Sequence, residues 1–496
     1  MGIVIRQGLK TTVLQYIGVG VGLVANLFLY TRAREAYGAA QVFIAAANVF
    51  APFAMLGAYS LVVRFYPRFG PEAEKQGFLT LLLGITTAGT GLYLLLSPLL
   101  QDFLLNTMYP DLDPEFRPLL RYLPGLVALL AYTKIFYQYA VNFRRLFVPV
   151  FFEQFVLKFT LPAAILAYYL GYIGAGGILA AIFINYSIAV LGIAAYLWRL
   201  GKLKLRPITA ELWASRGELA NYAAYGLAGM VGGTLAFRID TLMVAAYLDL
   251  ASAGTYTVLL FMSEVIAKPY TSLHAVLAPE VAEAWARKDM SALGELYKRS
   301  SINFLLVSLY VFGGIVVCYT AVTEMASEGE ALLAGFSTFL ALGISRLVNA
   351  GTSINEYVIS YSSKYRVNLI ATLVLAVLNV ILNVLLIPRF GLLGAGLATL
   401  ASTVIFHGGK VAYAYAQFGI QPFTRATWSL LLVCTLLAVA VYALPSAGEW
   451  WLDVGLKGGL YSLGVLAVVM YMKPSIEAER LVRQGFAKLG IGSKLS

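Results

Sequence analysis

The sequence GYIGAG at positions 171–176 recurs as GLLGAG at positions 391–396, 220 residues further along the chain. Each copy lies between two apolar stretches long enough to be helices, so each is expected to form the turn of a helical hairpin. At a similar offset of 216 residues, Gly38 corresponds to Gly254. The pattern predicts two copies of one six-helix unit, followed by two further helices.

Composition places these helices in a membrane. The 496 residues are 60% hydrophobic and only 12% charged, with a mean hydropathy of +0.78. An apolar run of about 20 residues spans the bilayer core, and by this measure we expect an all-α, polytopic membrane protein with about fourteen transmembrane helices. The expected helices cover residues 9–30, 38–63, 77–97, 118–141, 149–171, 175–199, 218–247, 254–279, 300–323, 331–360, 367–388, 392–416, 426–445 and 454–472.

The distribution of charged residues in the loops predicts the topology. Lysine and arginine favour cytoplasmic loops, and they are densest in residues 199–216, whereas the loop 98–117 carries several carboxylates. Both termini are therefore expected in the cytoplasm. Because six is an even number, both repeats start on the cytoplasmic side and are related by a pseudo-twofold axis along the membrane normal. Such pairs suit alternating access.

These assignments divide the chain into five segments. We expect an N-terminal six-helix lobe at 1–199, a cytoplasmic linker at 200–217, a C-terminal six-helix lobe at 218–416, helices 13 and 14 at 417–472, and a cytoplasmic tail at 473–496. The tail mixes basic and apolar residues in a way that fits an amphipathic helix on the inner membrane surface. A frayed tail is the alternative.

Several classes of function are disfavoured. The net charge of +11 is spread over short loops, where the positive-inside rule accounts for it, so no nucleic-acid partner is expected. Cys318, Cys434, His274 and His407 lie in expected spans without a ligand set, so neither a disulfide nor a metal site is indicated. There is no phosphate-binding loop of the ATPase type, and we expect no cofactor. The pair at 111 and 113 resembles a metal-binding D-x-D motif, but two carboxylates are common in a solvated loop.

The hairpin at 218–279 carries the most informative charges, namely Arg238, Asp240, Glu264 and Lys268. An ionisable group in the membrane is costly and usually faces a protein interior or a water-filled pathway. Other charges lie in the expected spans, but Glu153, Glu356 and Lys410 fall near the cytoplasmic interface, where long side chains reach water. The remaining deep cations are Lys134, Lys158, Arg238, Lys268 and Arg346, so a cationic cavity for an anionic substrate is predicted.

Alternatives remain open for each charge. Glu264 and Lys268 are four residues apart in the orientation that favours a helical ion pair. Arg346 is expected either to bind substrate or to bond to helix ends, and Lys134 and Lys158 either to line the cavity or to reach the interface. Arg238 and Asp240 should point to different faces of their helix.

The first repeat lacks counterparts to Arg238 and Asp240. At the 216-residue offset these positions hold Gly22 and Val24, so the shared scaffold does not require the two charges. A desolvated carboxylate at Asp240 or Glu264 would also be able to carry a proton during transport.

The chain resembles bacterial polysaccharide transporters of the Wzx type. The resemblance rests on Ile5-Arg-Gln-Gly-Leu-Lys10 with Tyr16-Ile-Gly18, on the two Gly-x-x-Gly-Ala-Gly turns, and on Asn379-x-x-x-Asn383. These transporters belong to one superfamily with MATE exporters and lipid II flippases. The motifs cover the whole chain but are structural, so they indicate the superfamily better than the substrate.

The resemblance implies a V-shaped bundle of two lobes in the bacterial cytoplasmic membrane. It would flip undecaprenyl-diphosphate-linked oligosaccharides outward through a cationic cavity, with Arg32 and Arg34 at the rim. We expect a monomeric transporter rather than an enzyme, with membrane lipids and other polysaccharide-assembly proteins as partners. The alternatives are a lipid II flippase, a MATE-type cation antiporter, for which an acidic cavity is expected, and a membrane-embedded glycosyltransferase, which usually needs a larger outer loop.

Overall fold

The structure, a computed structural model, describes residues 14, 17–69, 74, 76–110, 112–143, 147–326, 328–352, 354–364, 366–475, 477–480 and 484. Within these ranges the chain is helical and has no β-strand. The described residues include 12 helices long and apolar enough to cross a membrane, and a shorter apolar helix covers Ile17–Tyr30. The predicted all-α, multi-pass membrane fold is confirmed. Asp111 and most of the N-terminal motif lie outside the described residues.

The helices form two compact units, residues 1–257 and 258–496. In the first unit, α11 packs against α2 and α3, while α6 packs against α2 and α9. The elements of this unit are the π-helical segment η1 (Ala25–Tyr30) at the end of the first helix, α2 (Arg34–Met55), α3 (Ala58–Phe69), α5 (Phe78–Phe103), η2 (Leu104–Met108), η3 (Arg117–Tyr122), α6 (Leu123–Val141), α7 (Phe147–Val150), η4 (Phe151–Phe155), α8 (Leu157–Tyr169), α9 (Ala175–Arg199), α10 (Ala210–Ala214), α11 (Arg216–Tyr247) and the first turns of α12 (Leu250–Ala286).

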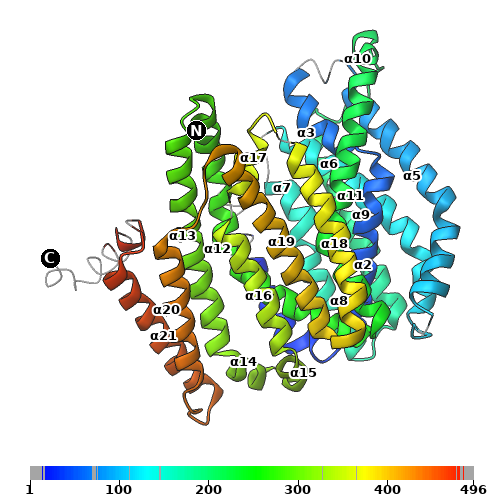
Figure 1. The fold of residues 1–496 in the computed structure, drawn as a ribbon. Helices are drawn as coiled ribbons and strands as arrows, with labels where there is room; N and C mark the ends of the chain where they lie inside the picture. The colour runs from blue at the N-terminus through cyan, green and yellow to red at the C-terminus, as the bar shows by residue number, and fades with distance from the viewer. Residues whose placement is uncertain are drawn as a thin grey trace. The chain divides into compact units, whose positions relative to one another are not determined.

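The second unit continues along α12 and ends in a helical hairpin formed by α20 and α21, which runs from orange to red in Figure 1. Its helices α18 and α19 pack along each other, and α16 packs against α13 and α19. Its other elements are α13 (Met290–Val317), α14 (Tyr319–Met325), α15 (Gly329–Ala334), α16 (Phe336–Gly351), α17 (Asn355–Ser360), α18 (Arg366–Phe390), α19 (Leu392–Phe418), α20 (Arg425–Tyr442) and α21 (Trp450–Met472).

Three helices that the sequence predicted as continuous are interrupted. The predicted helix 38–63 breaks after Met55, because Leu56 and Gly57 both adopt positive φ angles of 46° and 79°. A Cβ at Gly57 would lie 2.0 Å from the carbonyl oxygen of Ala223 in α11, so this glycine also allows close packing. The predicted helix 331–360 is divided into α15, α16 and α17, and the predicted helix 300–323 is divided between α13 and α14.

The two Gly-x-x-Gly-Ala-Gly turns lie where the repeat predicts them. Gly171 has φ +76° and connects α8 to α9, and Gly391 has φ +57° and connects α18 to α19. Both conformations favour glycine because they lie in the left-handed region. In the first turn, Glu115 accepts a hydrogen bond of 2.9 Å from the backbone N–H of Ala175 and so caps α9.

Gly38 and Gly254, which correspond in the two repeats, meet where α2 crosses α12. A Cβ at Gly38 would lie 1.8 Å from the carbonyl oxygen of Leu250, and a Cβ at Gly254 would lie 2.1 Å from that of Arg34. Leu250 is itself the counterpart of Arg34 at the 216-residue offset. The contact is therefore reciprocal, as a twofold relation between these two segments requires.

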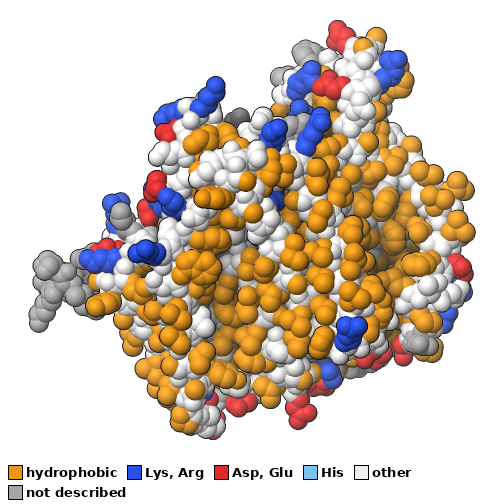
Figure 2. Space-filling model, viewed as in Figure 1, with side chains coloured by type: hydrophobic (Ala, Val, Ile, Leu, Met, Phe, Trp, Pro, Cys, Tyr) orange, Lys and Arg blue, Asp and Glu red, His pale blue; other side chains and the backbone are white. Residues whose placement is uncertain are grey.

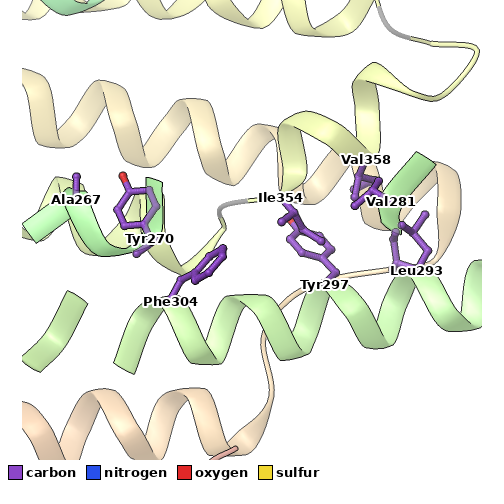
Figure 3. Packing of buried hydrophobic residues seen from close by; sticks show 11 residues of the cluster. Ala267, Tyr270, Val281, Leu293, Tyr297, Phe304, Ile354 and Val358 are labelled. Carbon is purple, nitrogen blue, oxygen red and sulfur yellow. The ribbon is translucent and has the colours of Figure 1, made fainter. Parts of the chain in front are cut away.

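The second unit has its own hydrophobic cluster, formed by α12, α13, α16, α17 and α19 (Figure 3). Tyr297, Leu293 and Ile354 are almost completely buried in it. On the face shown in Figure 2, hydrophobic side chains cover the middle of α18 and α19, and charged side chains lie towards helix ends. This distribution is the one expected for helices surrounded by lipid.

The first residues of the tail contact α13. Glu477 forms an ion pair with Arg299 and accepts a hydrogen bond from Asn303 Nδ2 at 3.3 Å. Partial burial alone would raise the pKa of Glu477, but the hydrogen bonds from Asn303, the backbone and Ser475 and the charge of Arg299 hold this pKa below its usual value. Apart from residues 473–475, 477–480 and 484, the predicted amphipathic tail lies outside the described residues.

We expect Glu477→Gln to release this attachment. Exposed ion pairs contribute at most about 1 kcal/mol, so tryptic cleavage after Arg480 should accelerate by about two- to fivefold at neutral pH. Glu295→Gln, which removes the exposed partner of Lys298, is the control and should leave cleavage unchanged. Because the pKa of Glu477 is depressed, the attachment is complete above the usual glutamate pKa and is lost as the pH falls below it. Equal cleavage of both variants would show that the ion pair does not hold the tail.

Candidate functional site

The two charges of α11 differ in exposure, as their spacing predicts. Arg238 is exposed, whereas Asp240 is buried with a relative exposure of 5%. The Tyr256 hydroxyl donates a hydrogen bond of 3.2 Å to Asp240 Oδ2. Asp240 is thus anchored between α11 and α12, while Arg238 is accessible.

Lys134 lies within electrostatic range of two other charged groups of the first unit, one of which is Arg238. Lys134 of α6 and Glu153 of η4 come from different helices, yet both Glu153 and Arg238 interact electrostatically with the Lys134 ammonium group. The Tyr186 hydroxyl of α9 also experiences the charges of Glu153 and Arg238. Four helical segments therefore bring two cations, one carboxylate and one tyrosine hydroxyl into electrostatic range.

Two further tyrosines complete this group. Tyr137 is one turn beyond Lys134 on α6, and Tyr59 belongs to α3; both interact electrostatically with Glu153. On α6, Lys134, Tyr137 and Gln138 are partly exposed, while most of their neighbours are buried. Their spacing of three and four residues places them on one face of the helix. We call Tyr59, Lys134, Tyr137, Glu153, Tyr186 and Arg238 the polar cluster.

Glu153 is the member that the sequence interpretation rejected. Residue counting predicts that Glu153 lies near the cytoplasmic interface; in the structure its Oε2 is buried and has no hydrogen-bond partner among the described residues. Glu153 lies in the π-helical segment η4, which changes the direction of side chains relative to a regular α-helix, and such segments are frequent at functional sites. The neighbouring Phe152 ring packs against α9 at Gly192, where a Cβ would lie 2.6 Å away.

The cations of the polar cluster lie within helices that are long and apolar enough to cross a membrane. Lys134 is about 17 Å along α6 from its first residue, and Arg238 is about 14 Å before the last residue of α11, at 1.5 Å per residue. If these helix ends lie at the membrane boundary, both positions fall within a hydrocarbon core about 30 Å thick. Charges at this depth require a protein-lined, hydrated surface, and an Arg–Lys pair there provides charge-assisted donors for an oxyanion.

The remaining predicted cations of the first unit lie elsewhere. The Lys158 side chain contacts the first helix at Gly18, where a Cβ would lie 2.7 Å from Nζ. Arg32 follows the first helix and lines a lateral groove. Arg34 begins α2, and its carbonyl group contributes to the Gly38–Gly254 crossing.

The second unit holds a separate group of charged residues around Arg346. Arg346 Nε donates a long hydrogen bond of 3.4 Å to Ser263 Oγ, and Tyr270 interacts electrostatically with both Arg346 and Glu264. Lys268, on the same helix as Ser263, is exposed. Ser263 and Tyr270 were not predicted, because nothing in the sequence indicates which polar side chains of α12 face α16.

The two histidines have structural partners. His407 Nδ1 lies 3.0 Å from Thr352 Oγ1 and 3.2 Å from Asn355 Nδ2, so it joins α19 to the break between α16 and α17. The His274 ring stacks on Tyr357 at 4.3 Å. Within the described ranges, no group of three or more His, Cys, Asp or Glu residues is placed to hold a metal ion.

Known structures with the same arrangement of helices belong to flippases and exporters. The lipid II flippase MurJ in an inward closed conformation matches 94% of this chain and 99% of its own, with a TM-score of 0.69 and 15% identity. An inward-facing multidrug resistance MATE transporter of the MOP superfamily matches 83% of this chain and 98% of its own, with a TM-score of 0.61 and 11% identity. The chain shares the fold of these two transporters.

Sequence comparison gives a curated relative that is also described as a flippase. The probable low-salt glycan biosynthesis flippase Agl15 of Haloferax volcanii is 21% identical over 245 residues, which are 47% of this chain and 51% of that protein. The chain thus matches about half the length of this relative. No family model matches the sequence. The polar cluster is therefore part of a multi-pass membrane protein that shares the fold of these transporters.

Proposed function

We propose that this protein is a flippase for a lipid-linked oligosaccharide. The observation that carries the proposal is the pair of cations, Lys134 and Arg238, which lie within electrostatic range of each other in two helices apolar enough to cross a membrane. A diphosphate loses its water in the membrane, and the two cations replace that water with charge-assisted hydrogen bonds. The substrate is proposed to be undecaprenyl diphosphate carrying an oligosaccharide repeat unit, as in Wzx-type transporters, and the likeness to a glycan biosynthesis flippase supports this choice.

Transport is proposed to follow alternating access, from the inner to the outer leaflet of the cytoplasmic membrane, with both termini in the cytoplasm. The excess of lysine and arginine in the predicted cytoplasmic loops supports this direction. Lys268 and Arg346 are proposed to contact the anionic group in a second position, and Asp240 or Glu264 to carry a coupling proton. The protein acts as a monomer in this proposal, alongside other polysaccharide-assembly membrane proteins.

A lipid II flippase is the second candidate. The structural likeness to MurJ over 94% of the chain favours it, and lipid II carries the same diphosphate. The cationic pair argues against a MATE-type cation antiporter, since a cationic substrate would be repelled by it. Neither candidate requires catalysis, and the similar proteins are transporters rather than enzymes.

Purified protein in proteoliposomes separates these candidates. We expect a fluorescent polyprenyl-diphosphate oligosaccharide to become accessible to a membrane-impermeant quencher faster than in protein-free vesicles, with and without an imposed pH gradient. Lipid II with a similar label and a cationic dye are tested in parallel. Preferred movement of lipid II would favour the second candidate. Dye transport without movement of either diphosphate lipid would contradict the proposal.

A further inference from the structure

A lateral groove of about 670 Å³ lies between the first helix and α8 in the first unit. One wall comes from the first helix through its π-helical segment, and the other comes from the second half of α8. The lining is apolar except for Arg32 and the hydroxyl group of Tyr169. The lining residues are Gly20, Val21, Val24, Ala25, Phe28, Leu29, Arg32, Pro162, Leu166, Tyr169 and Leu170.

Local sequence explains why these two helices leave a groove. Gly20 contributes no side chain, and Ala25 and Leu29 lie deeper than Val24 and Phe28, which are 59% and 39% exposed at the rim. On the opposite wall, Pro162 lies inside α8, where a proline bends a helix because it lacks an N–H group and crowds the preceding turn. Leu166 and Leu170 remain 45% and 54% exposed on this wall.

The groove has the length of one leaflet. Gly20 and Arg32 are its two ends along the first helix, and twelve residues correspond to about 18 Å. Half of a hydrocarbon core of about 30 Å is about 15 Å. A chain in the groove would therefore run from the bilayer midplane to the interface, where exposed Arg32 meets the headgroup. Under the proposed topology, this is the outer leaflet.

We propose that the groove binds the polyprenyl chain of the transported lipid next to its diphosphate, with Arg32 contacting the diphosphate. This inference rests on the proposed function and adds a binding site for the lipid part of the substrate after translocation. Charge and shape favour this occupant: a single guanidinium stands at the end of a single apolar channel, which fits one chain with an anionic end. The two acyl chains of a phospholipid need a broader surface.

Photolabelling in nanodiscs tests the groove directly. The probe is a polyprenyl diphosphate with a photoactivatable group in its first isoprene units. We expect peptide mapping to place the label on the groove walls, around Val24, Phe28 and Leu166. Val24→Trp with Leu166→Trp fills the groove, and Arg32→Ala removes the cation; each should reduce labelling by about tenfold. Leu95→Trp, at a lipid-exposed position of α5, is the matched control and should not reduce it.

Competition distinguishes the occupants. Unlabelled polyprenyl diphosphate should suppress labelling, whereas the same excess of phosphatidylglycerol should not. Equal suppression by phosphatidylglycerol, or labelling spread evenly over α5 and the groove, would overturn the inference. The proposed function is judged separately by flipping. If the wild type flips the oligosaccharide lipid and the groove-filled variant flips it equally fast, the groove proposal fails alone. If the wild type flips no diphosphate lipid, the function proposal fails first.

Discussion

Arg238→Ala is expected to abolish flipping of the oligosaccharide lipid while leaving membrane insertion intact. Arg238 is exposed and lies within electrostatic range of Lys134, so its removal leaves the protein packing largely unchanged but takes away the proposed bidentate, charge-assisted contact to the diphosphate. Loss of two hydrogen bonds to a charged group corresponds to about 100-fold or more in rate. The measurement is the initial rate of quencher accessibility per reconstituted protein.

Controls separate a local effect from a general loss of charge. Arg238→Lys retains the charge but not the fork of donors and should recover part of the rate. Arg389→Ala removes an exposed arginine from the last turn of α18 and should flip at the wild-type rate. Normal flipping by Arg238→Ala would remove the central contact of the proposal.

Glu153→Gln is expected to strengthen binding of the diphosphate lipid, whereas Arg238→Ala should weaken it. Glu153 contributes the negative charge near Lys134, so an incoming diphosphate is repelled by this carboxylate while it is attracted by the cations. Neutralising Glu153 should tighten binding of the diphosphate lipid and slow its release. A variant that binds more weakly than the wild type would instead assign Glu153 a direct role in holding the substrate.

Gly38→Val is expected to be the most destabilising substitution on the helix surfaces of the first unit. Any Cβ at position 38 meets the Leu250 carbonyl oxygen at 1.8 Å and the Gly254 backbone nitrogen at 2.9 Å. Backbone atoms cannot move aside as a side-chain end can, so α2 and α12 must separate. We expect a loss of about 3 kcal/mol or more, seen as a lower thermal unfolding temperature of the detergent-solubilised protein.

Two further variants test whether the close crossing of α2 and α12 causes this loss of stability: a substitution at an unpacked glycine, and a double variant at the crossing. A Cβ at Gly84 in α5 would meet nothing within 4 Å, so Gly84→Ala should be neutral or stabilising by about 0.5–1 kcal/mol. Gly254→Ala acts on the same crossing. Once one substitution has separated the helices, the second should cost much less, so the double variant should be clearly non-additive. Additive losses, or a wild-type unfolding temperature for Gly38→Val, would contradict the close crossing.

The fold could be predicted from the sequence wherever hydrophobic length and turn chemistry agree. Helix α9 begins and ends at the predicted residues 175 and 199, and both repeated turns contain the left-handed glycine that the pattern requires. The break after Met55 could not be foreseen, because Leu56 takes a left-handed conformation that only the contact of Gly57 with α11 explains.

The candidate site was predicted in part. Depth and charge were enough to select Arg238 and Lys134, since ions in hydrocarbon are costly wherever they occur. Glu153 was left out because residue counting places it near the cytoplasmic end of its helix, and nothing in the sequence indicates the π-helical segment η4. Tyr59, Tyr137 and Tyr186 were missed because tyrosines are frequent in this chain, and only packing of α3, α6 and α9 brings these three to one carboxylate.

The reciprocal crossing of Gly38 and Gly254 limits how far the two halves of the chain are able to diverge. Each glycine faces the segment that holds its own counterpart, so a larger residue in either half damages the same junction, and neither copy can change there alone. Positions away from this junction carry no such constraint. Arg238 and Asp240 stand where the first half has Gly22 and Val24, so the two halves differ freely in charge at positions that the crossing does not involve.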